Sequence, residues 1–318
     1  MIEVLRQLPG DLLILGAGGK MGPTLAMMAR RALPPQQEVV AASRFADQGV
    51  RSQLESAGIR TVPADLLDPK AVEHLPEASG LIFMAGQKFG TQAAPHVTWA
   101  MNAIVPSLVA RRFPGVRSVV FSTGNVYPLT PVASGGPTET DPVGPVGEYA
   151  QSCLARERIF EHAAATQNTP VAIVRLNYAI DLRYGVLLDT ALRVRNGEPV
   201  PLAMGHVNVI WQGDANARAL QCLALAASPA AIVNVTGPEI VSIRWLAERF
   251  GNRFGKTPCF SGEEAPDALL SNADRSVHLF GPPEVSLDQL IAWTADWIEA
   301  GGRRLDKPTR FEVRDGRF

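Results

Sequence analysis

The sequence has 318 residues, of which 46% are hydrophobic and 19% are charged, and its formal net charge is −1. This length allows one large α/β domain or two interleaved ones, and the composition excludes a largely disordered chain. A pI of about 6.5 excludes an overall electrostatic footprint for nucleic acid.

In the first half of the chain, short apolar runs alternate with longer helical patterns. The runs are continuous and partly β-branched, as expected for a parallel sheet that helices cover on both faces. The expected strands are Leu12–Leu15, Val39–Ala42, Leu81–Ala85, Ser118–Ser122 and Val171–Leu176, and the helical stretches between them include Thr24–Ala32, Thr98–Arg112 and Tyr149–Thr166. This alternation predicts a doubly wound parallel sheet over residues 1–180.

The second half is less regular. The expected helices are Asp189–Asn196, Asp214–Ala227, Ile243–Phe254 and Leu287–Ala300, and the expected strands are Val207–Trp211 and Ala231–Thr236. We interpret residues 181–318 mainly as a smaller C-terminal substrate lobe, with segments at about 206–211 and 231–236 returning to the sheet side.

Two further segments have distinctive compositions. The stretch 128–147 is rich in Pro, Gly, Ser and Thr, and a structureless stretch of that length is usually functional or mobile. Its place between Thr123 and Tyr149 favours a loop beside a ligand site, with an ordinary surface connection as the alternative. The tail Arg303–Phe318 mixes arginines with acids, so we expect a solvated extension.

Metal, disulfide and membrane signals are missing from the sequence. The three cysteines Cys153, Cys222 and Cys259 lie far apart, which predicts reduced thiols in a cytoplasmic protein. The five histidines are scattered, so we expect no metal site. No apolar run approaches the roughly 20 residues that span a bilayer, and the run Leu12–Leu15 leads directly into glycines as a buried strand does, rather than a signal peptide.

The segment Gly16-Ala17-Gly18-Gly19-Lys20-Met21-Gly22 follows the first strand and precedes the first long helix. In that context glycines permit a tight turn and let the backbone approach a pyrophosphate, while the helix supplies free N–H groups and its positive end. The segment therefore predicts a dinucleotide-binding turn. The alternative is a glycine-rich turn without a ligand.

The end of the second strand indicates which dinucleotide is bound. Sites for NAD usually carry an acid there, whereas an arginine accommodates a 2′-phosphate. Here Ser43 is followed by Arg44, which favours NADP over NAD, with a solvated arginine as the alternative. Asp65, after the run Arg60–Pro63, could accept from the adenine amine or act as a turn residue.

With these residues the chain resembles the extended short-chain dehydrogenases/reductases, which include NAD(P)-dependent epimerases and dehydratases that act on nucleotide sugars. The resemblance covers residues 11–178 and rests on Gly16-x-x-Gly19-x-x-Gly22, Asp65-Leu66, Ala85-Gly86, Asn102, Ser122-Thr123-Gly124-Asn125-Val126-Tyr127 and Tyr149. It implies a Rossmann fold whose cofactor contacts the glycine segment, Ser43, Arg44, Asp65, Leu66, Ala85, Gly86, Asn102 and Tyr149. A homodimer through helices on one face of the sheet would fit the family.

The resemblance also implies a catalytic set. Thr123 takes the place of the hydroxyl that binds the reacting oxygen, and Tyr149 takes the place of the general acid/base. The family carries a lysine four residues after the tyrosine, where it holds the nicotinamide ribose and lowers the tyrosine pKa, but this chain has Cys153. If that lysine lowers a tyrosine pKa of about 10 by about three units, its loss reduces the ionised fraction near pH 7 roughly a thousandfold.

Three readings of Cys153 stay open: a small buried residue, a thiol that lines the cofactor ribose, and a catalytic or redox thiol. Lys88 or Arg156 could supply the absent charge. By position, the candidate substrate-binding residues are Lys88, Asn125, Asn177, Tyr178, Arg183, His206 and Trp211, whereas Tyr184, Trp245, Trp293 and Trp297 are expected to pack in the core.

The resemblance implies NAD(P)-dependent oxidoreduction or epimerisation at a secondary alcohol of a sugar, sugar acid or nucleotide-sugar-like metabolite. The alternative is a non-catalytic NADP(H)-binding redox sensor or scaffold, because the cofactor half of the motif set is intact while the catalytic half lacks its cation. Retention of both Thr123 and Tyr149 favours the enzyme, since a sensor needs neither hydroxyl.

Overall fold

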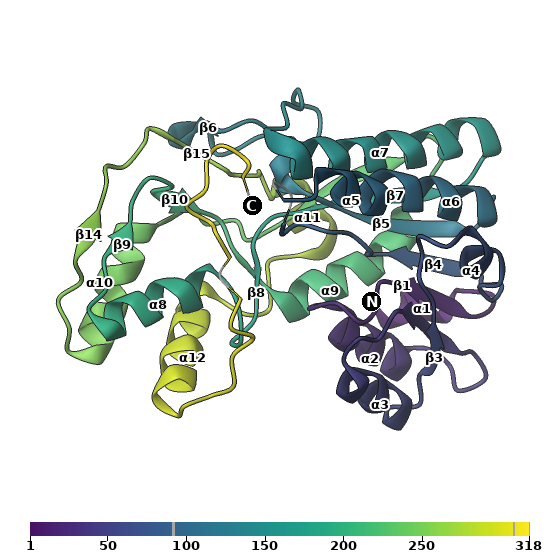
Figure 1. The fold of residues 1–318 in the computed structure, drawn as a ribbon, viewed down its shortest axis with the longest axis horizontal. Helices are drawn as coiled ribbons and strands as arrows, with labels where there is room; N and C mark the ends of the chain where they lie inside the picture. Colours follow the sequence, from purple (N-terminus) through teal and green to yellow (C-terminus); the bar gives the residue numbers. More distant parts are fainter. Residues whose placement is uncertain (91–92, 308, 318) are drawn as a thin grey trace.

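The computed structural model describes residues 1–90, 93–307 and 309–317, and its centre is a seven-stranded parallel sheet (Figure 1). The strands lie in the order β12-β7-β5-β4-β1-β2-β3. Their bounds are β1 Leu12–Leu15, β2 Val39–Ser43, β3 Arg60–Pro63, β4 Gly80–Phe83, β5 Arg117–Thr123, β7 Val171–Leu176 and β12 Ala231–Val235. From β1 the chain runs outward through β2 to β3, crosses back to β4 on the other side of β1, and then runs outward through β5 and β7 to β12. The doubly wound sheet predicted from the sequence is therefore confirmed.

Alternate side chains of each central strand enter two different cores. Leu12 and Ile14 pack with Leu25 on one face of the sheet, while Leu13 and Leu15 pack with Phe160 on the other. The first core is covered by α1 (Ile2–Arg6), α2 (Gly22–Ala32), α3 (Gln48–Ser56) and α9 (Gln212–Gln221), and the second by α4 (Pro69–Glu73), α6 (Val105–Arg112) and α7 (Gly147–Gln167) (Figure 1). Burial on both faces explains why these strands are continuously apolar rather than alternating.

The helix expected at Thr98–Arg112 is a composite. It consists of α5 (Pro95–Trp99), a π-helical turn at Ala100–Ile104 and α6. The wide turn contains Asn102, which is fully buried and faces the loop after β4. Irregular turns of this kind often lie at functional sites.

The smaller lobe packs three helices around its own core. These are α8 (Val186–Asn196), α10 (Ile243–Phe254) and α12 (Leu287–Glu299), while α11 (Asp274–Phe280) contacts β12. Two-residue strands pair around them: β8 (Ala179–Ile180) with β11 (Ile210–Trp211), β10 (His206–Val207) with β13 (Val241–Ser242), β9 (Val200–Pro201) with β14 (Phe260–Ser261), and β6 (Thr130–Pro131) with β15 (Asp267–Ala268).

Two expected elements of the second half need correction. The single strand expected at Val207–Trp211 is two short strands, β10 and β11, with different partners. The long helix expected at Asp214–Ala227 is α9 followed by a 3-10 turn at Cys222–Leu225. In contrast, the segment expected at 231–236 is β12, the edge strand of the main sheet.

The expectation of a solvated tail is wrong. Thr309 and Phe311 are buried, and the backbone N–H and the hydroxyl of Thr309 donate to Asp189 Oδ2 at 2.9 and 2.6 Å. Arg314 donates to the carbonyl oxygens of Ala203 and Asp267 at 3.0 and 2.9 Å. Arg314 therefore anchors the segment to the smaller lobe, whereas Arg303, Arg304, Arg310 and Arg317 are exposed.

Two tryptophans expected in the core lie at the surface. Trp293 and Trp245 are 39% and 40% exposed. Trp293 meets Trp211 edge to face at 5.9 Å, and Trp297 donates its ring N–H to the Arg303 carbonyl at 3.0 Å. In the described part of the chain, no helix is long and apolar enough to cross a membrane.

Candidate functional site

A cavity of about 170 Å³ lies where the carboxyl ends of the central strands meet the smaller lobe. Side chains reach it from the loops that follow β1, β5 and β7, which is where open α/β sheets bind their ligands. Its lining residues are Lys20, Met21, Lys88, Thr123, Asn125, Tyr149, Leu176, Asn177, Tyr178, Ala179, Ile180, Tyr184, Gly185, Val186 and Thr309. Lining residues from so many elements make this the candidate active site.

The loop after β1 is shaped by glycines that tolerate no side chain. Gly16 has a φ of +87°, and a Cβ there would lie 2.6 Å from the backbone nitrogen of Ala85. A Cβ on Gly22 would lie 2.3 Å from the Ala17 carbonyl oxygen. Helix α2 begins at Gly22 and has no acid in its first turn, so its positive end faces the loop without a compensating charge.

The residues expected to bind the adenine and its ribose lie near the ends of β2 and β3 and are more exposed. Ser43 ends β2 beside Gly18, and Arg44 is exposed. Asp65 is exposed too, and its carboxylate accepts from the Leu67 N–H at 3.1 Å, while Leu66 is buried. Asp65 therefore has the turn role that was the alternative for it.

Asn102 holds the loop after β4, which contains Ala85 and Gly86. Its amide donates to the Gln87 carbonyl and to Ser152 Oγ at 3.0 Å each, and its oxygen accepts from the Gln87 N–H at 3.0 Å. The same oxygen accepts from Arg156 at 2.6 Å. Gly86 leaves room for this guanidinium, because a Cβ there would lie 2.6 Å from Arg156 Nη2.

Thr123 and Tyr149 come together as expected. Thr123 ends β5 and donates to Asn125 Oδ1 at 2.9 Å, and Tyr149 lies in the first turn of α7. The Tyr149 hydroxyl makes hydrogen-bonding contacts with Thr123 and with the Cys153 thiol. Desolvation raises the pKa of Tyr149 well above its usual value, and it also raises the pKa of Cys153.

Cys153 is fully buried against Val126 and Tyr127, one helical turn after Tyr149. The thiol is therefore a packed side chain that also touches the Tyr149 hydroxyl. Arg156, one of the two cations that could replace the lysine, donates to the Phe121 carbonyl at 2.8 Å and to Asn102, so the protein interior holds its guanidinium.

Two lysines give the cavity a positive character. Lys20 donates to the Ala179 carbonyl at 2.8 Å and lies 4.1 Å from the Tyr184 ring centroid. Lys88 lies 5.9 Å from the Tyr149 ring centroid. Desolvation lowers the pKa of Lys20 to about 7 and that of Lys88 to about 8, and the charge of Lys88 contributes to the shift of Lys20. Among the described lining residues there is no carboxylate.

A model of the NAD dependent epimerase/dehydratase family matches residues 12–180, which is more than half of the chain. The chain belongs to this family. The resemblance inferred from the glycine segment and the Thr123–Tyr149 pair is thereby confirmed, whereas no protein with a curated description matches the sequence.

Solved structures of similar fold include three epimerases. The chain is 21% identical to a UDP-glucose 4-epimerase from Thermus thermophilus in complex with NAD, with a TM-score of 0.75 over 91% of this chain and 99% of that one. It is 16% identical to a UDP-glucuronic acid 4-epimerase from Bacillus cereus in complex with NAD, with a TM-score of 0.75 and coverages of 91% and 99%.

The third is a UDP-glucose 4-epimerase from Thermotoga maritima with UDP-glucose, at 16% identity, a TM-score of 0.74 and coverages of 92% and 99%. At these identities the likeness concerns the fold, which extends over both the sheet and the smaller lobe of this epimerase/dehydratase family member.

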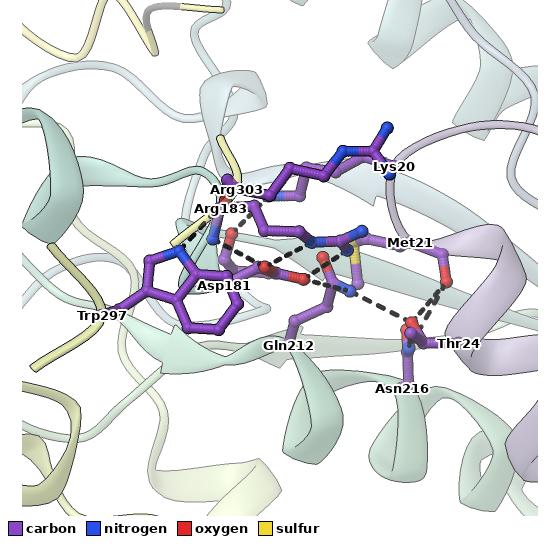
Figure 2. A network of polar contacts seen from close by, with 10 residues as sticks. Lys20, Met21, Thr24, Asp181, Arg183, Gln212, Asn216, Trp297 and Arg303 are labelled. Carbon is purple, nitrogen blue, oxygen red and sulfur yellow. Dashed lines mark hydrogen bonds and ion pairs between the residues drawn. The ribbon is translucent and has the colours of Figure 1, made fainter. Parts of the chain in front are cut away.

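A polar network joins the smaller lobe of this family member to its glycine loop (Figure 2). The guanidinium of Arg183 donates to both oxygens of Asp181 at 2.9 and 2.7 Å. Gln212 donates to Asp181 Oδ2 at 3.3 Å and to Thr24 Oγ1 at 3.1 Å, which links α9 to the first turn of α2. Arg183, a candidate for substrate contact, therefore serves this link and does not line the cavity.

The structure separates the other candidate substrate residues. Lys88, Asn125, Asn177 and Tyr178 line the cavity, whereas His206 and Trp211 do not. His206 belongs to β10, and Trp211 packs against Trp293. The stretch 128–147 also contributes nothing to the lining and is held by β6 pairing with β15.

Sequence reasoning missed three contributions to the site. Tyr184 was expected to pack in the core, yet it lines the cavity beneath Lys20. Asp181 could have been found only from its position two residues before Arg183, with which it forms an ion pair. Thr309 gave none, because the tail reaches the cavity from more than 100 residues away in the chain.

Proposed function

We propose that this protein is an NAD(P)-dependent epimerase or oxidoreductase that acts on a secondary alcohol of a sugar, sugar acid or nucleotide-sugar-like metabolite. The observation that carries the proposal is the contact between the Thr123 and Tyr149 hydroxyls inside a cavity bounded by the glycine loop. Two adjoining hydroxyls can bind the oxygen of an alcohol or ketone and pass a proton to it.

The residues present fit a dinucleotide. Gly16 and Gly22 let the loop pack directly against the backbone of Ala85 and Ala17, and α2 begins at this loop, so its N-terminus supplies free N–H groups there. We assign cofactor contacts to the glycine loop, including Gly18, Gly19, Lys20 and Met21, and to Ser43, Arg44, Asp65, Leu66, Ala85, Gly86, Asn102 and Tyr149. When bound, the nicotinamide would accept a hydride and return it. The NAD in the T. thermophilus and B. cereus enzymes supports this assignment.

The chain's own residues would handle the substrate oxygen. Thr123 would orient it, and Tyr149 would hold and move its proton. Asn125, Asn177 and Tyr178 face the cavity and would bind other hydroxyls of a sugar. The amines of Lys20 and Lys88 carry a positive charge below about pH 7 and pH 8, and the described lining residues include no carboxylate, which supports a substrate that carries an anionic group. The UDP-glucose of the T. maritima enzyme is one such molecule.

Arg44 supports a preference for NADP, because no acid stands at the end of β2 to bind a free ribose hydroxyl. Titration with NADPH and NADH, followed by fluorescence, tests this preference in wild type and in Arg44→Ser. We expect NADPH to bind at least about tenfold more tightly, in line with one charge-assisted phosphate contact, and Arg44→Ser to remove the difference. Equal affinities in wild type would refute it.

Turnover on a panel of sugars, sugar acids and nucleotide sugars tests the reaction. We expect Tyr149→Phe to abolish turnover with little change in cofactor affinity, because the ring stays and only the hydroxyl is lost. Trp245→Phe, a substitution of an exposed side chain on α10, is the matched control and should leave turnover unchanged.

One observation favours a second function, a non-catalytic NADP(H) sensor or scaffold. Cys153 supplies no charge to Tyr149, and the pKa of that tyrosine is raised rather than lowered. If wild type binds the dinucleotide tightly and converts nothing in the panel, the sensor is the correct reading. Turnover that disappears in Tyr149→Phe excludes it.

A further inference from the structure

Helix α7 brings no usable cation to Tyr149. The position one turn after the tyrosine holds the buried, uncharged Cys153. Arg156, the next cation on the helix, donates to the Phe121 carbonyl and to Asn102, and an arginine does not release its proton. A partner that exchanges protons with Tyr149 must therefore come from another element.

Lys88 reaches Tyr149 from the loop after β4. Its amine lies 5.9 Å from the centre of the Tyr149 ring, and both side chains line the same cavity. Lys88 and Cys153 lie close enough for a charge on either one to shift the pKa of the other, which places the amine near the thiol that touches the Tyr149 hydroxyl. Asn102 fixes this loop through its hydrogen bonds with Gln87, the residue before Lys88.

The use of lysine in this chain is selective. The 30 basic residues comprise 25 arginines and only five lysines, and two of those five, Lys20 and Lys88, line this cavity. Arginine is always charged, whereas a desolvated lysine can give up its proton.

We propose that Lys88 takes the place of the missing lysine and exchanges a proton with the Tyr149 hydroxyl during the reaction. The proposal rests on the function proposed above. As the substrate alcohol is oxidised, its hydroxyl proton passes to the Tyr149 oxygen while Tyr149 gives its own proton to the neutral Lys88 amine, which becomes an ammonium. The C–H bond breaks and its hydrogen leaves with both bonding electrons as a hydride to the dinucleotide, so the alcohol becomes a ketone, and all steps reverse on reduction.

The raised pKa of Tyr149 opposes release of its proton to Lys88 by itself, so Tyr149 gives that proton up only as it receives the proton of the substrate hydroxyl. Lys20 acts on Lys88 from the glycine loop, Arg156 and Cys153 act on Tyr149 from α7, and Glu157 lies near Cys153. Desolvation lowers the pKa of Lys88 to about 8, so a substantial fraction of the amine is neutral near that pH. The raised pKa of Tyr149 means that the tyrosine alone would hold its proton.

Four variants test the proposal through kcat and its pH profile. We expect Lys88→Met to lower kcat about a hundredfold and to remove an inflection near pH 8. Lys88→Arg should lower kcat to a similar extent, because the arginine keeps a positive charge but cannot accept a proton. Adding Cys153→Lys to Lys88→Met should raise kcat at least tenfold above that of Lys88→Met. Lys256→Met, which replaces an exposed lysine, should leave kcat unchanged. An Lys88→Arg variant with wild-type kcat and pH profile overturns the proposal, as does a folded double variant without recovery.

A second measurement does not depend on turnover. Reductive ¹³C-methylation of the five lysines, with the Lys88 signal assigned by its loss in Lys88→Arg, gives the pKa of that amine by NMR. We expect a pKa about two units below the ordinary lysine value, and a further fall of about one unit in Cys153→Lys, because a second cation would stand beside the amine. An ordinary pKa that Cys153→Lys leaves unchanged overturns the proposal. If wild type converts no substrate, the proposed function fails. The titration still decides whether the Lys88 amine is desolvated and close to position 153, beside Tyr149.

Discussion

Removing Arg175 should strongly destabilise the protein, because this side chain neutralises a carboxylate in the interior. Arg175 on β7 and Glu157 on α7 are 3% and 0% exposed, and they join through hydrogen bonds of 2.8 Å (Nη2 to Oε2) and 3.0 Å (Nε to Oε1). Ser122 also donates to Glu157, and Arg175 donates to the Tyr127 hydroxyl at 2.8 Å. The pair thus ties the helix that carries Tyr149 to the centre of the sheet.

Arg175→Met would leave the Glu157 carboxylate buried without a counter-charge. Removal of one partner of a buried pair typically costs about 3–5 kcal/mol, a large part of a total stability of about 5–15 kcal/mol. Glu157→Gln/Arg175→Met should lose much less than the sum of its two single variants, since it buries no charge. Urea denaturation followed by circular dichroism measures all three.

The chain offers a matched control in the pair Arg249–Asp288, which has the same 2.8 Å separation but side chains 47% and 77% exposed. Arg249→Met should cost less than about 1 kcal/mol. If Arg175→Met costs no more than Arg249→Met, or if the double variant loses the full sum of the two single variants, the reasoning from burial is refuted.

Three further predictions concern the site. Gly22→Ala should weaken dinucleotide binding at least about tenfold, because the new Cβ would lie 2.3 Å from the Ala17 carbonyl oxygen and displace the loop; unchanged affinity in a fluorescence titration would contradict this. Asn102→Ala should cost about 2–3 kcal/mol in urea, since it removes one of the two acceptors of the buried Arg156 and both side-chain hydrogen bonds of the Gln87 backbone; a loss below about 0.5 kcal/mol would count against it. Lys20 has a pKa of about 7 when folded and 10.5 when unfolded, so the unfolded chain binds more protons between these values and the free energy of unfolding should rise with pH, by at most about 1.4 kcal/mol per unit. Lys20→Met should show a shallower rise between pH 7 and 9.5, because only Lys88 then contributes a lowered lysine pKa, and an identical slope in both proteins would refute the assignment.

The main sheet could be predicted because its signals are local. Each central strand is a short apolar run buried on both faces, and β1 leads directly into a glycine segment whose geometry needs no distant partner to be recognised. The meeting of Thr123 with Tyr149 was predictable through the family resemblance alone. Nothing in their spacing of 26 residues would otherwise place the two hydroxyls together.

The smaller lobe could be predicted much less well because its elements depend on distant contacts. A two-residue strand such as β10 has too little intrinsic preference to be found, and it exists because β13 lies beside it. Trp293 followed a helical pattern that suggested the core, yet it covers Trp211 at the surface. In the same way, the desolvation of Lys20 and Lys88 arises from residues of both lobes and leaves no pattern in the sequence.

The tail has a consequence for the order in which the molecule assembles. Its contacts join Thr309 to Asp189, Arg314 to Ala203 and Gly316 to Gly147, pairs that are 120, 111 and 169 positions apart. Contacts at such separation close large loops and form late in folding, after the locally connected sheet. The cavity wall would therefore be the last part to form and the first to open, so amide hydrogens of residues 309–317 should exchange through local opening while β1 and β4 stay protected.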